Sequence, residues 1–315
     1  MECFGGISDD DGDDNKDETK VMVRRDLSCG VCCFHLHTET SLLAAIRNSM
    51  TSVVTDSPSR DVLCAIDEFC LSRHWMMHVG PEKGDILIEA LRSSMLEKTQ
   101  LNSTLTSGLD CIPFIAVELG TYCGYSSILM GRTMREMLTS GNTRIDCPRI
   151  DCPRIDCHLI TTEINEEYVQ IATEIILLSQ MQDLISVHEI SYNGHDTDIV
   201  ATVSDAIMRS RNSLNKAATI DFLFIDHDKN AYKSDLRKLE RSGMIRRGTK
   251  VVADNVLFAR IDDYVEYVKQ REEMGIVKTI TIPCHVEYSV DKDESGDSLQ
   301  HFEDGVEITD YLQDP

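Results

Sequence analysis

The chain has 315 residues, of which 42% are hydrophobic, and a formal net charge of −23. This length suits one large α/β domain or two small ones, and the strong negative charge argues against a nucleic-acid partner. No apolar run approaches the roughly 20 residues of a membrane span, and the acidic N-terminus lacks the features of a secretory signal. We therefore expect a cytoplasmic monomer with no membrane span, whose 12 cysteines are mostly reduced core residues.

Acidic residues are concentrated at both ends of the chain. Residues 1–20 are rich in Asp and Glu without hydrophobic periodicity, which predicts a disordered tail. The acidic residues of 287–315 are also expected to be solvated. Residues 21–60 form an extension of uncertain structure, whose cluster of cysteines and histidines at 29–37 could hold zinc or be a loop with buried thiols. A single domain is expected over 61–315.

Strand and helix patterns alternate through this domain. Apolar residues recur at helical spacing from Asp61, the segment 75–80 interrupts them, and Pro81 is expected to open a second helix. Predicted strands begin at Phe114 and cover 158–163, 184–189, 220–225, 249–254, 276–283 and 305–312. Predicted helices between them cover 128–138, 166–180, 196–210, 234–245 and 262–275. This alternation predicts a mostly parallel sheet covered by helices on both faces, with insertions at the repeat 144–158 and at an acidic loop near 291–302.

Two of the predicted strands end in oxygen-bearing side chains. Asp226 follows one apolar run, and Asp254 and Asn255 follow the next. The carboxyl ends of parallel strands meet at one edge of an open α/β sheet, where such folds build their sites. Carboxylate and amide oxygens suit Mg²⁺, and Lys229 lies close enough in sequence to reach whatever the metal holds. The sequence therefore predicts a Mg²⁺ site.

A glycine turn follows the first predicted strand, in the order Glu118, Gly120, Gly124. The spacing differs from the G-x-G-x-x-G of dinucleotide binders, and the leading acid favours a cationic ligand over a pyrophosphate. Glu163 ends the second strand, where an acid can accept hydrogen bonds from ribose hydroxyls. Together these features indicate a nucleoside cofactor without a pyrophosphate, and S-adenosylmethionine fits that description.

A series of motifs, in order along the chain, resembles catechol O-methyltransferase. The motifs are Trp-Met-Met-His-Val-Gly-Pro-Glu-Lys-Gly (75–84), Val-Glu-Leu-Gly-Thr-Tyr-Cys-Gly-Tyr-Ser (117–126), Leu-Ile-Thr-Thr-Glu-Ile-Asn (159–165), Asp-His-Asp-Lys (226–229) and Ala-Asp-Asn-Val (253–256). The resemblance covers roughly 60–312, apart from the repeat and the acidic loop. It implies an S-adenosylmethionine-dependent, Mg²⁺-requiring methyltransferase with a Rossmann-like class I fold, a seven-stranded sheet and a catechol-type small-molecule substrate.

The resemblance also implies roles for individual residues. Mg²⁺ would be held by Asp226, Asp254 and Asn255, and Lys229 and Glu287 would be catalytic, with Lys229 taking a catechol proton and Glu287 holding the second hydroxyl. The acceptor would lie against Trp75, Lys229, Asn255 and Glu287. The cofactor would be surrounded by Met77, Val79, Glu118, Gly120, Tyr122, Ser126, Glu163, Ser191, Asp226 and His227.

Three positions depart from the family pattern. Asp228 stands where tryptophan is common, His78 replaces an asparagine, and Ala259 replaces a proline that walls the substrate. The metal and base residues survive, whereas the apolar frame of the acceptor pocket changes. Two alternatives therefore stay open: a non-catalytic protein that binds S-adenosylmethionine and recruits partners, or an O-methyltransferase for another phenolic acceptor such as a hydroxycinnamoyl thioester.

Overall fold

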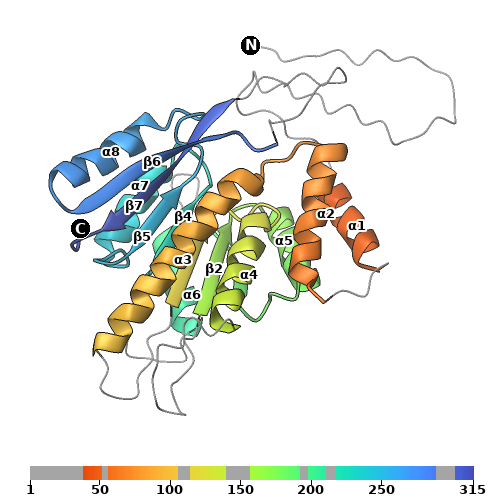
Figure 1. Cartoon of the computed structure of the whole chain (residues 1–315), viewed down its shortest axis with the longest axis horizontal. Coiled ribbons are helices and arrows are strands. Elements are labelled where there is room, and N and C mark those ends of the chain that lie inside the picture. The colour runs from red at the N-terminus through yellow and green to blue at the C-terminus, as the bar shows by residue number, and fades with distance from the viewer. Residues whose placement is uncertain are drawn as a thin grey trace, which may run out of the picture.

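One seven-stranded sheet organises the protein. In this computed structural model the described residues are 38–51, 56–105, 114–139, 157–191, 198–210, 218–288 and 302–315. The strands are β1 (Phe114–Leu119), β2 (Cys157–Glu163), β3 (Ile185–Glu189), β4 (Phe222–Ile225), β5 (Lys250–Ala253), β6 (Val277–His285) and β7 (Glu303–Tyr311). They lie in the order β3-β2-β1-β4-β5-β7-β6 (Figure 1). Strands β1 to β5 pair in parallel, and β7 runs antiparallel to both β5 and β6.

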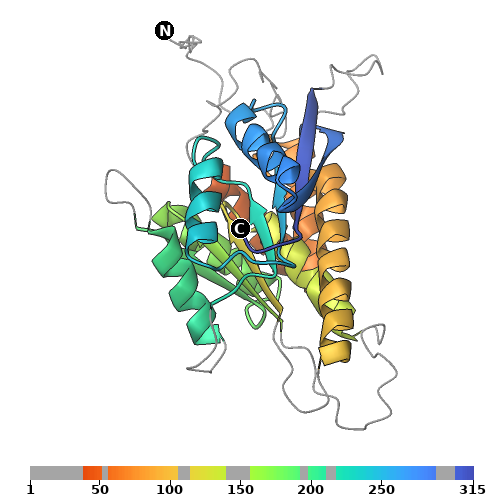
Figure 2. The ribbon, with the colours of Figure 1, turned by 90° about the vertical axis from the view of Figure 1, so that its left-hand side faces the viewer.

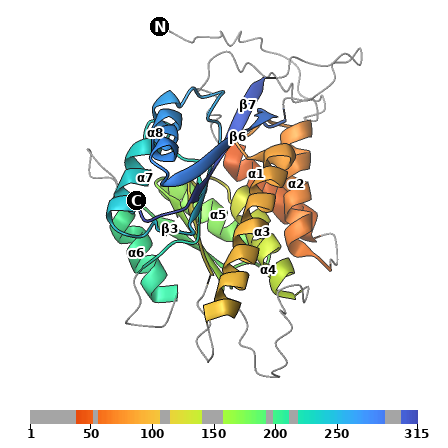
Figure 3. The same cartoon turned by 60° about the vertical axis from the view of Figure 1, so that its left-hand side comes forward.

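Helices cover both faces of the sheet. They are α1 (Thr38–Thr51), α2 (Pro58–Ser72), α3 (Gly80–Leu105), α4 (Tyr125–Thr139), α5 (Glu166–Leu178), α6 (Ile199–Ser210), α7 (Tyr232–Arg241) and α8 (Asp262–Glu273). Figure 2 shows the sheet between α3 on one side and α6, α7 and α8 on the other. Helices α1 and α2 lie outside α4 and α5, on the same side as α3 (Figure 3).

Alternating side chains of the central strands pack into two separate hydrophobic cores, one on each face of the sheet. In β1, Phe114 and Ala116 join the core under α1 to α5, whereas Ile115 and Val117 join the core under α6 to α8. Because successive strand residues point to opposite faces, a strand that is apolar throughout must be buried on both sides. All six residues of β1, five of them apolar and the sixth Glu118, are buried, so β1 is covered on both faces.

The predicted alternation of strands and helices is confirmed, with small shifts at the ends. Helix α7 starts two residues earlier than predicted and ends at Arg241 rather than 245. Gly243 adopts a left-handed φ of +76° just past the helix end, where glycine commonly terminates a helix. The extension 21–60, whose structure the sequence left open, contains α1.

Several predictions concern residues outside the described ranges. They are the disordered tail 1–20, the Cys/His cluster 29–37, all but the last two residues of the repeat 144–158, and the acidic loop up to 301. The division into a tail, an extension and one domain stays a prediction. Within the described residues, no helix combines the length and the apolar character that crossing a bilayer requires.

Candidate active site

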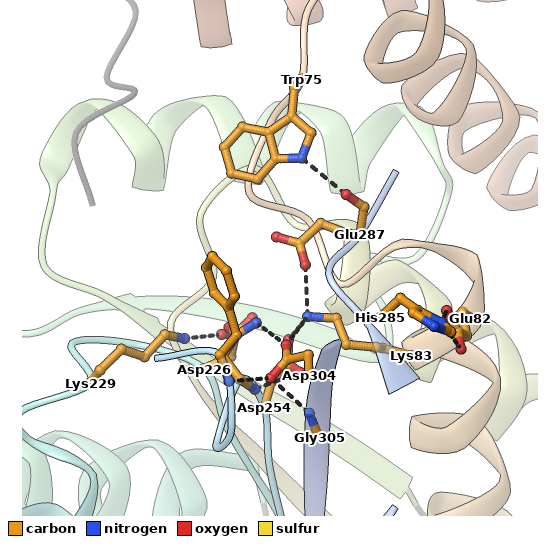
Figure 4. A network of polar contacts seen from close by, with 12 residues as sticks. Trp75, Glu82, Lys83, Asp226, Lys229, Asp254, His285, Glu287, Asp304 and Gly305 are labelled. Atoms are coloured by element: carbon orange, nitrogen blue, oxygen red, sulfur yellow. Dashed lines mark hydrogen bonds and ion pairs between the residues drawn. The ribbon is translucent and has the colours of Figure 1, made fainter. Parts of the chain in front are cut away.

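The predicted metal ligands meet at the carboxyl edge of the sheet. Asp226 follows β4 and Asp254 follows β5, and these strands pair in parallel with Ile225 opposite Ala253. The Asp254 backbone N–H donates to the Ile225 carbonyl at 3.1 Å. The two carboxylates therefore leave neighbouring strands at the same level, and Figure 4 shows their side chains close together.

A buried lysine, Lys83, lies at the centre of the acidic cluster (Figure 4). Its side chain is fully enclosed, and Nζ lies 2.8 Å from Asp254 Oδ2, 2.7 Å from Glu287 Oε2 and 3.3 Å from Asp304 Oδ2. Burial alone would lower the pKa of Lys83, but the three carboxylates raise it well above its usual value. Lys83 is therefore a permanent cation inside the site.

Asn255 is held in one orientation by Asp304. Its backbone is left-handed, with φ +58°, and its side-chain Nδ2 donates to Asp304 Oδ2 at 2.8 Å. The other oxygen of Asp304 accepts from the backbone N–H groups of Phe258 and Gly305, at 3.0 and 2.7 Å. Because the amide nitrogen is fixed on Asp304, the amide oxygen of Asn255 faces away from that carboxylate and remains available as a ligand.

The charges of the cluster fit a divalent cation. Four carboxylates, Asp226, Asp254, Glu287 and Asp304, face two lysines, Lys83 and Lys229. Burial and the nearby negative charges raise the pKa of Asp254 against the attraction of Lys83, and burial raises that of Glu287. When all are ionised, two negative charges remain uncompensated. Among the described residues, no three His, Cys, Asp or Glu side chains form a metal site by themselves, so the candidate set is two carboxylates with the Asn255 amide.

Lys229 lies beside this cluster at the start of the β4–α7 loop. Its Nζ donates to Asp226 Oδ1 at 2.6 Å and to the Tyr232 hydroxyl at 2.8 Å. Tyr232 is fully buried, and burial raises the pKa of its phenol well above the usual value. The tyrosine therefore stays neutral and acts as a fixed acceptor, while the Lys229 side chain remains about one third exposed (32%).

Two of the four predicted substrate residues, Trp75 and Glu287, are joined directly. The Trp75 indole N–H donates to the Glu287 backbone carbonyl at 3.0 Å, although the two residues lie 212 positions apart. Gly80 is needed here, because a Cβ at this position would approach Glu287 Cβ to 3.0 Å. Figure 4 shows the indole above the Glu287 side chain, which reaches down to Lys83.

The glycine turn after β1 contacts the loop that carries Asp226. Gly120 has φ +98°, and a Cβ there would lie 2.3 Å from the Asp226 carbonyl oxygen. Only glycine allows this approach. In the same turn Tyr122, with φ +48°, donates its backbone N–H to Glu163 Oε2 at 2.9 Å, and Glu163 Oε1 accepts from the Ile164 and Asn165 N–H groups. The turn, Glu163 and Asp226 are therefore neighbours.

Glu118 is completely buried below the turn. It accepts hydrogen bonds from Ser126 Oγ at 2.5 Å and from Ser127 Oγ, both in the first turn of α4. Burial raises the pKa of its carboxyl to about 7, against the lowering effect of the two serine hydroxyls. An acid of this kind is poised to ionise when a cation approaches.

The remaining predicted cofactor residues are Met77, Val79, Ser191 and His227. His227 Nε2 lies 2.8 Å from Asp235 Oδ2, and its ring stacks on Tyr232. Val79 is buried and Met77 is 40% exposed in the segment that precedes α3. Ser191 follows β3, on the far side of β2, and is exposed; no side-chain contact links it to the turn among the described residues.

The three departures from the family pattern have different structural settings. His78 is buried between Tyr122 and Tyr125, with ring centroids 5.2 and 5.5 Å away. Asp228 is exposed, and its Oδ1 accepts from the backbone and side-chain nitrogens of Asn230, both at 3.0 Å. Ala259 is exposed as well. Asp228 thus shapes its own loop instead of placing a large apolar wall beside Lys229.

Three functional neighbours were missing from the sequence-based prediction. Lys83 and Asp304 join the candidate metal ligands to Glu287, and Glu39 of α1 accepts from the Tyr122 hydroxyl at 2.8 Å. Lys83 lies inside the 75–84 motif and Asp304 beside the last predicted strand, so the sequence could have singled out each residue. It could not have predicted that they pair, because Lys83 is 171 positions from Asp254 and 221 positions from Asp304.

A glycine turn after β1, an acid ending β2 and polar side chains after β4 and β5 define a Rossmann-like methyltransferase. A family profile described as a methyltransferase domain matches residues 117–256. Catechol O-methyltransferase B of Danio rerio is 30% identical over 248 residues, which are 79% of this chain and 73% of that protein. Catechol O-methyltransferase of Bos taurus is 29% identical over 210 residues, which are 67% of this chain and 60% of that protein.

Among solved structures, the O-methyltransferase from Bacillus cereus in complex with SAH aligns with 87% of this chain and 99% of that chain. The TM-score is 0.46 and the sequence identity 15%. The chain belongs to the catechol O-methyltransferase family, and it is an S-adenosylmethionine-dependent O-methyltransferase.

Proposed function

We propose that this protein transfers a methyl group from S-adenosylmethionine to one hydroxyl of a Mg²⁺-chelated catechol-type small molecule. The observation that carries the proposal is the meeting of Asp226, Asp254 and the Asn255 amide at the ends of β4 and β5, beside the glycine turn. Oxygen donors from rigid strand ends suit a hard divalent cation, and a cofactor bound along the turn would lie next to them.

The metal candidates fit Mg²⁺ in charge and in donor type. The cluster has two uncompensated negative charges when its acids are ionised. The Asn255 amide nitrogen is fixed on Asp304, which leaves the amide oxygen available as a ligand. When bound, Mg²⁺ supplies a Lewis acid that stabilises a phenolate, and S-adenosylmethionine supplies the methyl group. Asp226, Asp254 and Asn255 would hold the ion.

Lys229 and Glu287 would handle the two hydroxyls of the acceptor. A phenol of pKa about 10 is a weak nucleophile at neutral pH, so a base must accept its proton. Lys229 Nζ is held by Asp226 and Tyr232 at the edge of the metal candidates, where its neutral amine form would take that proton and become an ammonium. The buried Glu287 carboxyl has a raised pKa and lies below Trp75 (Figure 4), where it would hold the second hydroxyl.

The cofactor would lie along the glycine turn. Glu163, whose carboxylate already accepts backbone hydrogen bonds at the turn, would accept the ribose hydroxyls. Glu118 and Ser126 would lie beneath the cofactor, Met77, Val79, Tyr122, Ser191 and His227 would surround it, and Asp226 would lie between cofactor and metal. Fixing both reactants next to each other can lower the barrier by about 7–11 kcal/mol.

The decisive experiment measures transfer of a labelled methyl group to a panel of vicinal diphenols and hydroxycinnamoyl thioesters. We expect turnover of the vicinal diphenols that disappears on chelation and returns with Mg²⁺. The Asp254→Ala variant should lose turnover while keeping its affinity for S-adenosylmethionine. Methylation of the thioesters alone would show that the acceptor is a hydroxycinnamoyl thioester and not a catechol. Full activity of Asp254→Ala would show that Asp254 is not a required metal ligand.

A further inference from the structure

Lys83 is the least exposed lysine or arginine among the described residues, and the proposed function gives it no chemical role. It lies in the first turn of α3 and reaches Asp254 after β5, Glu287 after β6 and Asp304 in β7. Its side chain is 0% exposed, and the three carboxylates are between 0% and 8% exposed. One ammonium therefore ties α3 to the segments after β5 and β6 and to β7, at the carboxyl edge of the sheet.

Every partner of Lys83 is connected to the proposed chemistry. Asp254 is a proposed metal ligand, and Glu287 is the proposed holder of the second hydroxyl. Asp304 binds no substrate or metal in the proposal, but its Oδ2 accepts from Asn255 Nδ2 at 2.8 Å and so decides which way that amide points. Its Oδ1 is anchored on the Phe258 and Gly305 backbone, which makes Asp304 a rigid support.

We propose that Lys83 and Asp304 are a positioning pair that prepares the Mg²⁺ site before the ion binds. Lys83 draws one oxygen each from Asp254, Glu287 and Asp304 to a common point, and Asp304 presents the Asn255 amide oxygen toward the ion. Without the ammonium, the three buried carboxylates would repel each other. This inference rests on the proposed function, because it assumes that Asp254 and Asn255 hold the metal.

An ion pair that only stabilises the fold would have the same contacts. The test must therefore measure a quantity that does not depend on the stability of the protein. Mutating the partners of metal ligands typically weakens metal affinity 10- to 100-fold, whereas a buried ion pair that serves only folding can often be replaced by apolar groups. Metal affinity, measured on folded protein, separates these two roles.

The chain offers a matched control on the same helix. Lys98 is also mostly buried in α3, 11% exposed, and its Nζ lies 2.6 Å from Asp221. Asp221 immediately precedes β4, at the opposite edge of the sheet from Asp226. Lys98→Met therefore removes a buried lysine–aspartate pair of the same kind, far from the site.

The experiment titrates Mg²⁺ into the purified full chain by calorimetry, for wild type, Lys83→Met, Asp304→Asn and Lys98→Met. Circular dichroism checks folding, and a separate titration measures the dissociation constant for S-adenosylmethionine. We expect roughly 10- to 100-fold weaker Mg²⁺ binding in Lys83→Met and Asp304→Asn. Lys98→Met should bind Mg²⁺ like wild type, and cofactor affinity should stay within about twofold in all variants.

Asp304→Asn keeps the inference testable where Lys83→Met does not fold. A single amide oxygen cannot serve both Asn255 and the Phe258 and Gly305 N–H groups, so Asn255 should lose its fixed orientation. In this variant the Mg²⁺ concentration for half-maximal methyl transfer should rise about tenfold, with the maximal rate restored at saturating Mg²⁺.

The outcomes separate the two proposals. Wild-type Mg²⁺ affinity in Asp304→Asn, or an equal loss in Lys98→Met, would show that the pair is only structural and would leave the proposed function intact. Absence of Mg²⁺ binding by the wild-type protein would overturn the proposed function and this inference together.

Discussion

Lys229 is held by two hydrogen bonds, to Asp226 at 2.6 Å and to Tyr232 at 2.8 Å. Positioning of this kind matters for a base, since proton transfer needs a heavy-atom distance within hydrogen-bond reach. For Lys229→Ala we expect the maximal rate to fall about 10²- to 10⁴-fold, with a much smaller change in the Michaelis constant.

Steady-state kinetics at saturating Mg²⁺ check this expectation, with Lys233→Ala as the control. Lys233 lies four residues later, in the first turn of α7, and its ion pair with Asp263, at 3.9 Å, is long and partly exposed, so its loss should leave the rate unchanged. A normal maximal rate in Lys229→Ala would assign the proton to another acceptor.

Glu118 predicts a pH dependence of cofactor binding. Its folded pKa is about 7 because the carboxyl is buried, so ionisation increases as the pH rises through this value. A cationic sulfonium should bind the ionised form, and its affinity should therefore increase roughly tenfold between about pH 6 and pH 8. Calorimetric titrations of S-adenosylmethionine across this range, compared with Glu118→Gln, measure the effect; equally steep curves for both proteins would exclude Glu118 as its source.

At the scale of elements, the β1–α4 turn and the β4–α7 loop can meet only because residue 120 lacks a side chain. An alanine Cβ at this position would lie 2.3 Å from the Asp226 carbonyl oxygen, with φ at +98°. We expect Gly120→Ala to lower the free energy of unfolding by about 3 kcal/mol or more, from the clash and the backbone strain together. Cofactor affinity should fall as well, since the turn must move.

Gly243→Ala is the matched control for this prediction. Gly243 also has a positive φ, +76°, but a Cβ there would meet nothing within 4 Å. Gly243→Ala should lower the free energy of unfolding by the backbone strain alone, about 1–2 kcal/mol. Its cofactor affinity should be unchanged. Denaturant unfolding and cofactor titration of both variants make the comparison, and equal losses would mean that the Asp226 contact can relax.

The sequence predicted the elements well where burial is uniform. Strand β4 is a continuous apolar run, and β1 is apolar except for Glu118; such runs between turn signals are typical of central parallel strands. Helix α7 was predicted to reach 245, with Gly243 or Gly248 as its terminator. Met244 and Ile245 continue the apolar pattern, but the helix already ends at Arg241, two residues before Gly243. The sequence did not predict helix α1. This helix packs on α2 and α5 and lies outside the alternation of strands and helices on which the prediction was based.

The candidate site could be predicted only in part for a similar reason. Residues at strand ends, such as Asp226 and Asp254, are brought together by the topology of the sheet, which the sequence indicates. Lys83 is different, because a lysine is almost never fully buried unless it is paired, so its burial can be predicted only when its partners are known. Those carboxylates come from segments more than 170 positions away, and local patterns carry no information about them.

At the scale of the whole molecule, the acidic C-terminal region is not uniformly solvated, contrary to the prediction. Strand β7 lies between β5 and β6, and this buries Asp304 and Glu307, which are 1% and 0% exposed. Glu307 accepts hydrogen bonds from the hydroxyls of Thr279 and Thr281 on β6. The charge of −23 therefore includes acids that the fold must neutralise internally, by lysine or by hydroxyl groups.

His78 makes the stability of the whole fold depend on pH. Burial lowers the pKa of this histidine to about 3 from 6.5, and no side chain of the described residues is bonded to its Nε2. Below about pH 6.5 the unfolded chain binds a proton that the folded protein does not, so acidification stabilises the unfolded state. The contribution is fully present above pH 6.5 and is lost progressively down to about pH 3.

Replacing His78 by asparagine, the residue the family pattern has there, removes this proton linkage. Between about pH 7.5 and pH 5, wild type should lose about 2 kcal/mol more unfolding free energy than His78→Asn. Other titrating groups act on both proteins alike, so the difference between the two isolates His78. Urea unfolding at both pH values measures it, and parallel losses would mean that the His78 ring is protonated, and therefore hydrated, in the folded protein.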